Sequence, residues 1–445
     1  MTTSAPWALE HSYDSTATPS RFWLWTLLVG LAFFIADQDP RMLEAESWDA
    51  EVYSADEHSE RIAGGNLLRQ AMFLSLGLAG VYGLASSQGR KLDWRDPLVL
   101  TCVGFLAWAA LSVAWSNDPG LSLRRVLRLA CVYAAALGLV RHFSPRDFLR
   151  MAFAIALGWF VFSIGLELAL GRFQPWQENY RFCGMMHPNL QVLQCGVLVL
   201  AAVAILASET RPDWFVRGTL LVAGASFLLT RSRTALAAMV VAFVVAWLAK
   251  PGGRKLPWVF AAALVASAVG LFAGLFGSGV DQGVANVALL GRSEDVGSLT
   301  GRLPLWTELV GHGLVRPLTG YGYGAFWGPE RAEIVADALS VRGWQIPHAH
   351  SSFIDAFLSL GLIGVTALAL TMIVALVRAV KRYHAAPIAE SLFLLGLITF
   401  GACDALAESS VVEPSFFCFL ILCSALQLTF PAQQHSADES QFNWN

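Results

Sequence analysis

The chain has 445 residues, of which 56% are hydrophobic and 14% charged, and its mean hydropathy is +0.54. Soluble proteins carry about 25% charged residues, so this composition predicts an integral membrane protein. The formal net charge of -3 argues against a nucleic-acid partner. The seven cysteines form no CxxC pair and no His/Cys metal spacing, so we expect neither a disulfide framework nor a metal centre.

Hydrophobic segments recur along the whole chain. A membrane-spanning helix needs roughly 20 apolar residues, and 12 segments approach that length. We therefore predict an all-α integral membrane protein, a polytopic helical bundle of about 12 transmembrane helices. The N-terminus lacks the features of a cleaved secretory signal, so the first span is expected to remain as an anchor. The segments centre on residues 22–36, 67–85, 97–116, 124–140, 148–170, 187–207, 214–230, 234–249, 257–276, 351–377, 388–407 and 414–430.

These segments predict five consecutive parts. The largest is a transmembrane bundle of about nine spans, interrupted by an acidic outer loop. A large periplasmic loop with short helices separates it from the last spans. The parts are a cytoplasmic N-terminal tail 1–21, the bundle 22–276 with outer loop 37–66, the periplasmic loop 277–350, the C-terminal spans 351–430 and a cytoplasmic tail 431–445.

The distribution of lysine predicts the orientation. Short cytoplasmic loops of membrane proteins are enriched in lysine and arginine. With both termini in the cytoplasm, every lysine of the chain falls on the cytoplasmic side, and the long loop 277–350 lies on the outer side. The lysines are Lys91, Lys250, Lys255 and Lys381.

The first outer loop is strongly acidic, with nine carboxylates but only one arginine, Arg41, between residues 37 and 60. Asp37 and Asp39 resemble the paired carboxylates that hold a divalent cation in some membrane glycosyltransferases. A solvated acidic loop explains the same composition. We predict no metal site here.

Among the arginines of the predicted outer face, three places stand out: Arg181, the pair Arg231 and Arg233, and Arg302. Arginine presents a planar fork of donors that binds phosphate bidentately. Ionisable groups at a membrane boundary suggest function, although arginines can also extend to lipid headgroups. We expect an anion site at these arginines if the helices bring them together.

A short amphipathic helix is expected to begin close to Arg302. Pro304 follows it, and proline is favoured in the first turn of a helix. Apolar residues repeat at four-residue spacing from there, which indicates a helix along the outer surface that ends near Gly311 or Gly313.

The run GYGYGAFW at 320–327 combines tight-turn glycines with Tyr321, Tyr323 and Trp327. Aromatic residues at a membrane interface commonly form a belt at the headgroups. They also stack on sugar rings. We include the three rings as candidate substrate-binding residues.

His350 is the candidate general base, because histidine titrates near neutrality and can accept a proton from a hydroxyl. It stands in PHAHSSFIDAFL, where Ser351 and Asp355 share one face of the following helix. His348, Ser351 and Asp355 are candidate substrate-binding residues. Alternatively, His348 and His350 only cap an interfacial helix. Other candidate bases are Asp355, Glu308 and Glu330.

The sequence His187-Pro188-Asn189 precedes the sixth span. Proline at the first helical turn and a polar side chain before it are typical of a helix start. We therefore expect a structural role, with His187 or Asn189 as the cap.

The order of the motifs resembles the O-antigen ligase/polymerase superfamily (Wzy/WaaL-like). The particular residues within these motifs resemble most closely those of exopolysaccharide polymerases of the succinoglycan type. The stretch from Arg181 to Gly364 carries the resemblance. Its motifs are RxCGxxHPN at 181–189, SRT at 232–234, TGR…W at 300–306, GYGYGAFW at 320–327 and HSSFID at 350–355, with WSNDP at 115–119 upstream.

The resemblance implies a metal-independent inverting glycosyltransferase of the bacterial inner membrane, without a cofactor. It would act at the periplasmic face on an undecaprenyl-pyrophosphate-linked glycan donor and a sugar acceptor. Arg233, Arg302 and His350 match the family's functional positions, with Arg231 and Arg181 as further candidates. Position 351 is Ser where many relatives have Asn, which bears on how the acceptor is positioned.

The predicted function is polymerisation of lipid-linked repeat units into a surface polysaccharide or exopolysaccharide. Membrane lipids and a chain-length copolymerase are expected partners. One alternative is an O-antigen ligase that transfers the glycan to lipid A core. Another is a transporter or flippase, but the halves of the chain show no repeat. A transporter is expected to carry charged residues in the middle of its spans. In this chain the charged residues that come closest to such a position are Asp404 and Glu408, near the outer end of the eleventh segment.

Overall fold

The computed structural model describes residues 19–38, 66–177, 180–208, 213–251, 298–328, 331, 334, 335, 338 and 348–431. Every regular element within these residues is a helix. The predicted ninth span at 257–276, nearly all of the acidic outer loop and much of the long loop lie outside the described residues.

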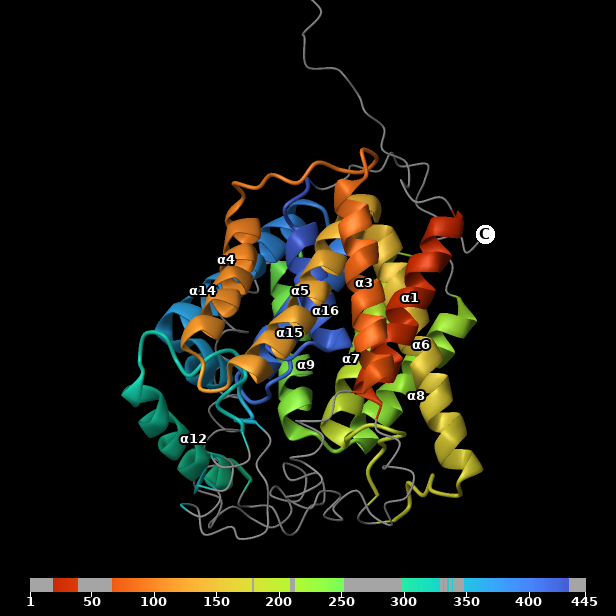
Figure 1. Cartoon of the computed structure of the whole chain (residues 1–445). Coiled ribbons are helices and arrows are strands. Elements are labelled where there is room, and N and C mark those ends of the chain that lie inside the picture. Colours follow the sequence, from red (N-terminus) through yellow and green to blue (C-terminus); the bar gives the residue numbers. More distant parts are fainter. Residues whose placement is uncertain are drawn as a thin grey trace, which may run out of the picture.

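The helices follow the predicted hydrophobic segments (Figure 1). Eleven of the 12 segments overlap a described helix, and six helices are long and apolar enough to cross a membrane. The count of about 12 spans stays a prediction. The helices are α1 (Pro19–Asp37), α3 (Leu67–Ala85), α4 (Pro97–Leu111), the 3-10 helix η2 (Ser112–Trp115), α5 (Pro119–His142), α6 (Pro145–Ala169), α7 (Pro188–Ser208), α8 (Trp214–Leu229), α9 (Arg233–Ala249), α12 (Ser298–Val315), α14 (Ser352–Ala385), α15 (Ala389–Asp404) and α16 (Phe416–Gln427).

Local sequence explains where several helices begin. Asp96, Asp118 and Ser144 each accept a hydrogen bond from a backbone N–H in the first turn of the next helix. Each is followed by proline at the first helical position, where the missing N–H costs nothing. The same signal therefore starts α4, α5 and α6.

The loops that the lysine distribution assigned to the cytoplasm contact one another at one end of the bundle. Arg378, at the end of α14, pairs with Asp96 before α4 at 2.7 Å. His384 contacts the carbonyl of Ala249, the last residue of α9, at 3.0 Å. In Figure 1 the connection between α3 and α4 lies at this end, opposite α12.

The predicted outer loops meet at the other end. The indole of Trp115 donates to the carbonyl of Thr319 at 3.1 Å. The backbone N–H of Phe182 donates to the carbonyl of Leu229 at 3.0 Å. These contacts join described loops that the charge distribution assigns to the same side.

A break in α14 anchors the glycine-aromatic run. Gly361 has φ 65° and ψ -165°, which interrupts the helix. The break frees carbonyls in the preceding turn: Leu358 accepts from the N–H of Tyr321 at 2.9 Å, and Ser359 from that of Gly322 at 3.0 Å. The run at 320–327 is therefore hydrogen-bonded to the membrane helix.

The helix expected near Arg302 is longer than predicted. It begins at Ser298, so Pro304 lies inside it, and it continues past Gly311 and Gly313 to Val315. The expected end was wrong because isolated glycines weaken a helix without ending it. Proline disfavours helical geometry in the residue before it, and Pro317 follows shortly after the helix ends.

Candidate active site

The carboxylate of Glu408, four residues after α15, is the centre of a polar cluster. Its Oε1 accepts from Arg302 Nη2 at 2.8 Å and from Asn189 Nδ2 at 3.1 Å. Its Oε2 lies 3.3 Å from Nδ1 of His350. The side chain of Glu408 is only 9% exposed. Two of the residues singled out in the sequence therefore share one buried counter-charge.

Arg181 connects this cluster to the turn between α8 and α9. Its Nη2 donates to Oδ1 of Asn189 at 2.9 Å, and its Nε donates to the carbonyl of Thr230 at 2.8 Å. The three arginine-containing segments of the outer face thus converge through side-chain hydrogen bonds. The path runs from Thr230 through Arg181 and Asn189 to Glu408 and Arg302.

The turn itself places Arg231 and Arg233 differently. Arg231 has φ 54°, in the left-handed region that non-glycine residues rarely adopt. Its guanidinium lies toward the carbonyl of Gln177 at 3.4 Å. Arg233 is the first residue of α9. The turn reaches the cluster through its Thr230 carbonyl, which accepts from Arg181.

The electrostatics of the cluster keep Glu408 ionised. Burial raises the pKa of this carboxyl, but the hydrogen bond with His350 and the charge of Arg302 outweigh burial and lower the pKa to about 2. Near neutral pH, Glu408 therefore compensates the charge of Arg302. The guanidinium of Arg302 is held in place by this ion pair.

His350 also sits in the left-handed region, with φ 50°. Non-glycine residues in such geometry cluster at active sites, where the surrounding structure holds the strain. A carboxylate at Nδ1 favours the tautomer whose Nε2 carries the lone pair. His350 is one-fifth exposed, so the cluster does not enclose it. It has the arrangement expected of a general base.

A second hydrogen-bonded group, centred on Asp355, lies next to the turn that contains His348 and His350. Asp355 accepts from the indole of Trp327 at 2.7 Å, from the N–H of Ala349 at 3.2 Å and from the hydroxyl of Ser409. Ser409 also contacts Nδ1 of His348 at 3.4 Å. Burial, and then the neighbouring His350, lowers the pKa of His348. Asp355 and His348 are therefore suited to position the turn that carries His350.

The remaining polar candidates lie in structural positions. Ser351 precedes α14 as its N-cap and is buried. Glu308 contacts His312 one turn later in α12 at 3.4 Å. Glu330 lies outside the described residues.

The aromatic candidates are buried. The hydroxyl of Tyr321 donates to the carbonyl of His312 at 2.8 Å, and that of Tyr323 to the carbonyl of Val412 at 2.7 Å. The guanidinium of Arg331 covers the ring of Tyr321 at 4.3 Å. The structure thus places Tyr321 in the packing of the loop.

The predicted cap of α7 is confirmed. The helix begins at Pro188, and Nδ1 of His187 accepts from the N–H of Asn189 at 3.2 Å. The Asn189 side chain turns instead to Arg181 and Glu408.

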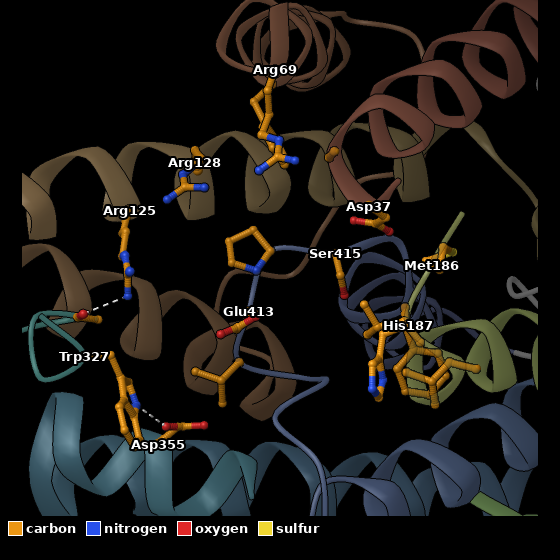
Figure 2. Close-up of a pocket in the computed structure, with 18 of the residues that line it drawn as sticks. Asp37, Arg69, Arg125, Arg128, Met186, His187, Trp327, Asp355, Glu413 and Ser415 are labelled. Atoms are coloured by element: carbon orange, nitrogen blue, oxygen red, sulfur yellow. Dashed lines mark hydrogen bonds between the residues drawn. The ribbon is translucent and has the colours of Figure 1, made fainter. Parts of the chain in front are cut away.

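A cavity of about 380 Å³ adjoins the cluster. Figure 2 shows Asp355, Trp327 and His187 on its wall, together with three arginines from the first half of the chain. Among the residues that the structure describes, no group of three or more His, Cys, Asp or Glu could hold a metal ion.

Glu408, Asn189 and Ser409 were not candidate site residues in the sequence. Glu408 carried a signal, because an ionisable residue close to a membrane span is a functional candidate by default. Its partners lie 58, 106 and 219 residues away along the chain, so no local motif reveals the pairing.

Comparisons with known proteins identify the class. The family model described as O-Antigen ligase matches residues 218–369, which contain Arg231, Arg233, Arg302 and His350. The predicted resemblance is confirmed: the chain is a helical membrane protein that is similar to the O-antigen ligase/polymerase superfamily.

One curated relative matches most of the chain. The exopolysaccharide production protein ExoQ of Rhizobium meliloti (strain 1021) is 28% identical over 362 residues, which cover 78% of this chain and 81% of the relative. The match supports a ligase- or polymerase-type function in polysaccharide biosynthesis.

Proposed function

We propose that the protein polymerises undecaprenyl-pyrophosphate-linked repeat units at the periplasmic face of the bacterial inner membrane. The observation that carries the proposal is the cluster in which one buried carboxylate holds both Arg302 and His350. A phosphate-binding group and a proton acceptor are thereby fixed side by side. The similarity to an exopolysaccharide production protein favours polymerisation.

The proposed reaction is a single displacement without a metal ion. Nε2 of His350 takes the proton from an acceptor sugar hydroxyl, whose oxygen attacks the anomeric carbon of the donor. The bond from that carbon to the pyrophosphate oxygen breaks, with inversion. Arg302 and Arg233 stabilise the negative charge that develops on the leaving pyrophosphate.

The test uses membranes that contain the lipid-linked repeat unit. His350→Ala and Arg302→Ala are each expected to abolish polymer while the protein remains inserted in the membrane. His384→Ala, at the opposite end of α14, serves as the control and is expected to leave polymer length unchanged. Normal polymer from both His350→Ala and Arg302→Ala would overturn the assignment.

Ligation is the second candidate function, because the matching family model is described as O-Antigen ligase. Lipid-linked repeat units supplied alone distinguish the two reactions. A polymerase lengthens the lipid-linked chains. A ligase leaves them unchanged until its separate acceptor is added.

A further inference from the structure

The cavity beside the Glu408 cluster is lined by charged side chains of both signs. Its volume of about 380 Å³ lies within the range of small-molecule sites. Among the residues that the structure describes, three arginines and three acidic residues line it. They are Arg69, Arg125, Arg128, Asp37, Asp355 and Glu413, all labelled in Figure 2. With equal numbers of opposite formal charges, the wall favours neither an anion nor a cation.

Gln194 of α7 lines the same cavity and carries an unsatisfied polar atom. The residue is 3% exposed, and its Oε1 has no hydrogen-bond partner within the described part of the chain. Leaving a buried acceptor without a donor is energetically unfavourable. A ligand that donates a hydrogen bond to this oxygen therefore gains affinity from it.

Other parts of the wall offer both donors and acceptors. Nη1 of Arg125 donates to the carbonyl of Gly324 at 2.7 Å, which fixes the guanidinium at the wall. Glu413, on the loop between α15 and α16, is exposed. A guanidinium only donates hydrogen bonds, and an ionised carboxylate only accepts them. A ligand that matches this wall must therefore both accept and donate.

These requirements define the chemical class of the ligand. A hydroxyl group donates one hydrogen bond and accepts others, so a molecule with several hydroxyls can satisfy arginine, carboxylate and the Gln194 oxygen together. A fully ionised phosphate lacks the donor that this oxygen needs, and a lipid tail lacks donors and acceptors alike. The indole of Trp327, which donates to Asp355 at 2.7 Å, adds an apolar ring to the wall (Figure 2). A sugar ring, with hydroxyls at its edge and C–H groups on its faces, matches both features.

The cavity lies next to the turn of the proposed general base. Asp355 forms part of its wall and accepts from the N–H of Ala349, the residue before His350, at 3.2 Å. His187, also on the wall, precedes the helix whose Asn189 donates to Glu408. A sugar in the cavity is thus adjacent to the cluster that carries the proposed reaction.

We propose that this cavity binds an uncharged sugar ring of the acceptor glycan, and that Gln194 helps to select it. The inference rests on the proposed function, because it places the acceptor sugar beside the histidine that takes its hydroxyl proton. It assigns recognition in this cavity to hydroxyl groups and not to a phosphate.

The test measures binding without turnover. The probe is the oligosaccharide that mild acid releases, without phosphate, from the lipid-linked repeat units of the host cells. Full-length protein is placed in phosphatidylcholine nanodiscs, which present no sugar headgroup, and Kd is determined by saturation-transfer NMR. We expect saturable binding to the wild type and about a fivefold higher Kd for Gln194→Leu, since one neutral hydrogen bond is lost.

Thermal unfolding distinguishes a binding role of Gln194 from a structural one. Leucine is close to glutamine in size, and it removes a buried amide whose oxygen has no partner among the described residues. The melting temperature of Gln194→Leu is therefore expected to equal or exceed that of the wild type. A lower melting temperature with unchanged Kd would assign Gln194 to packing and refute the inference.

Gln191→Leu is the matched control. Gln191 is also a buried glutamine of α7, but its Oε1 accepts from the hydroxyl of Ser163 at 3.4 Å and it is not among the residues that line the cavity. The Kd of this variant should equal that of the wild type. An increase as large as that of Gln194→Leu would contradict a specific role for Gln194.

Inorganic pyrophosphate and a second variant separate sugar recognition from phosphate recognition. We expect pyrophosphate not to displace the oligosaccharide. Glu413→Gln, on the exposed part of the wall, should raise Kd because a charged acceptor is replaced by a neutral one. Displacement by pyrophosphate, or tighter binding by Glu413→Gln, would identify an anion site instead. Absence of saturable binding to the wild type would also overturn the inference.

The outcomes keep this inference separate from the proposed function. Gln194-dependent sugar binding in a protein that neither polymerises nor ligates would remove the proposed function and leave the sugar site standing. Polymer formation by a protein whose sugar binding does not depend on Gln194 would keep the function and remove this inference.

Discussion

Glu408 holds two side chains with different proposed tasks, and one substitution tests this arrangement. Glu408→Gln removes the charge opposite Arg302 and the anion that orients His350. Removing one partner of a buried ion pair costs about 3 kcal/mol, so we expect a lower melting temperature together with loss of polymer. The measurements are thermal unfolding in detergent and polymer formation in membranes. A variant with wild-type polymer would show that the carboxylate does not position the histidine.

The low pKa of Glu408 predicts how its contribution depends on pH. The pKa is lowered from 4.5 to about 2, so the stabilisation is fully present above pH 4.5 and is lost as pH falls toward 2. The difference in unfolding temperature between the wild type and Glu408→Gln should therefore be constant from about pH 5 to 8. It should shrink below about pH 4.5. Tryptophan fluorescence during heating gives the comparison, and a difference that stays constant down to pH 3 would contradict it.

Sequence alone singled out Arg302, His350 and Arg181, which the structure brings into one cluster, because charged and titratable residues at a membrane boundary are conspicuous. It did not identify Asn189, whose amide joins Arg181 to Glu408. The side-chain contacts of the cluster connect segments far apart in sequence. Tyr321 looked like a sugar-stacking residue, but local sequence does not show that its hydroxyl and ring are used in packing.

The break in α14 joins a membrane helix to the loop that carries the site. The hydrophobic run predicted this helix, but not the break, since glycine is also common in unbroken membrane helices. At Gly361 an added Cβ would lie 2.2 Å from the carbonyl carbon of Leu318. The conformation and the close contact both require glycine.

Gly361→Ala is therefore expected to destabilise the protein. The combination of φ 65° and ψ -165° is essentially restricted to glycine and costs about 1–3 kcal/mol for a residue with a Cβ, and the contact with Leu318 adds to it. Gly104→Ala in α4 is the control, because a Cβ there meets nothing within 4 Å. Its stability should stay within about 1 kcal/mol of the wild type. Thermal unfolding compares the two, and equal effects would refute the account of the break.

At the scale of the whole molecule, lysine distribution and apolar runs predicted much of the architecture. They divided the loops into two groups, and contacts such as Arg378 with Asp96 join loops of the same group. The enrichment of lysine and arginine in short cytoplasmic loops further predicts which group faces the cytoplasm. It carries no information on the packing order of the helices.

The predicted orientation can be tested with alkaline phosphatase, which is active only in the periplasm. A fusion after residue 345, in the long loop, is expected to be active. A fusion after residue 386, beyond α14, is expected to be inactive. The reverse result would place the Glu408 cluster on the cytoplasmic side and exclude a periplasmic reaction.

The contacts between α5 and the glycine-aromatic run can form only long after α5 has been synthesised. Ser122 donates to the carbonyl of Tyr323 and Arg125 to that of Gly324, with 201 and 199 residues between the partners. At roughly 5–20 residues per second, a ribosome needs about 10–40 s to make that length. During this interval the inserted α5 keeps polar groups whose final partners do not yet exist. The nascent bundle must therefore provide water, lipid headgroups or another protein for them until the second half of the chain arrives.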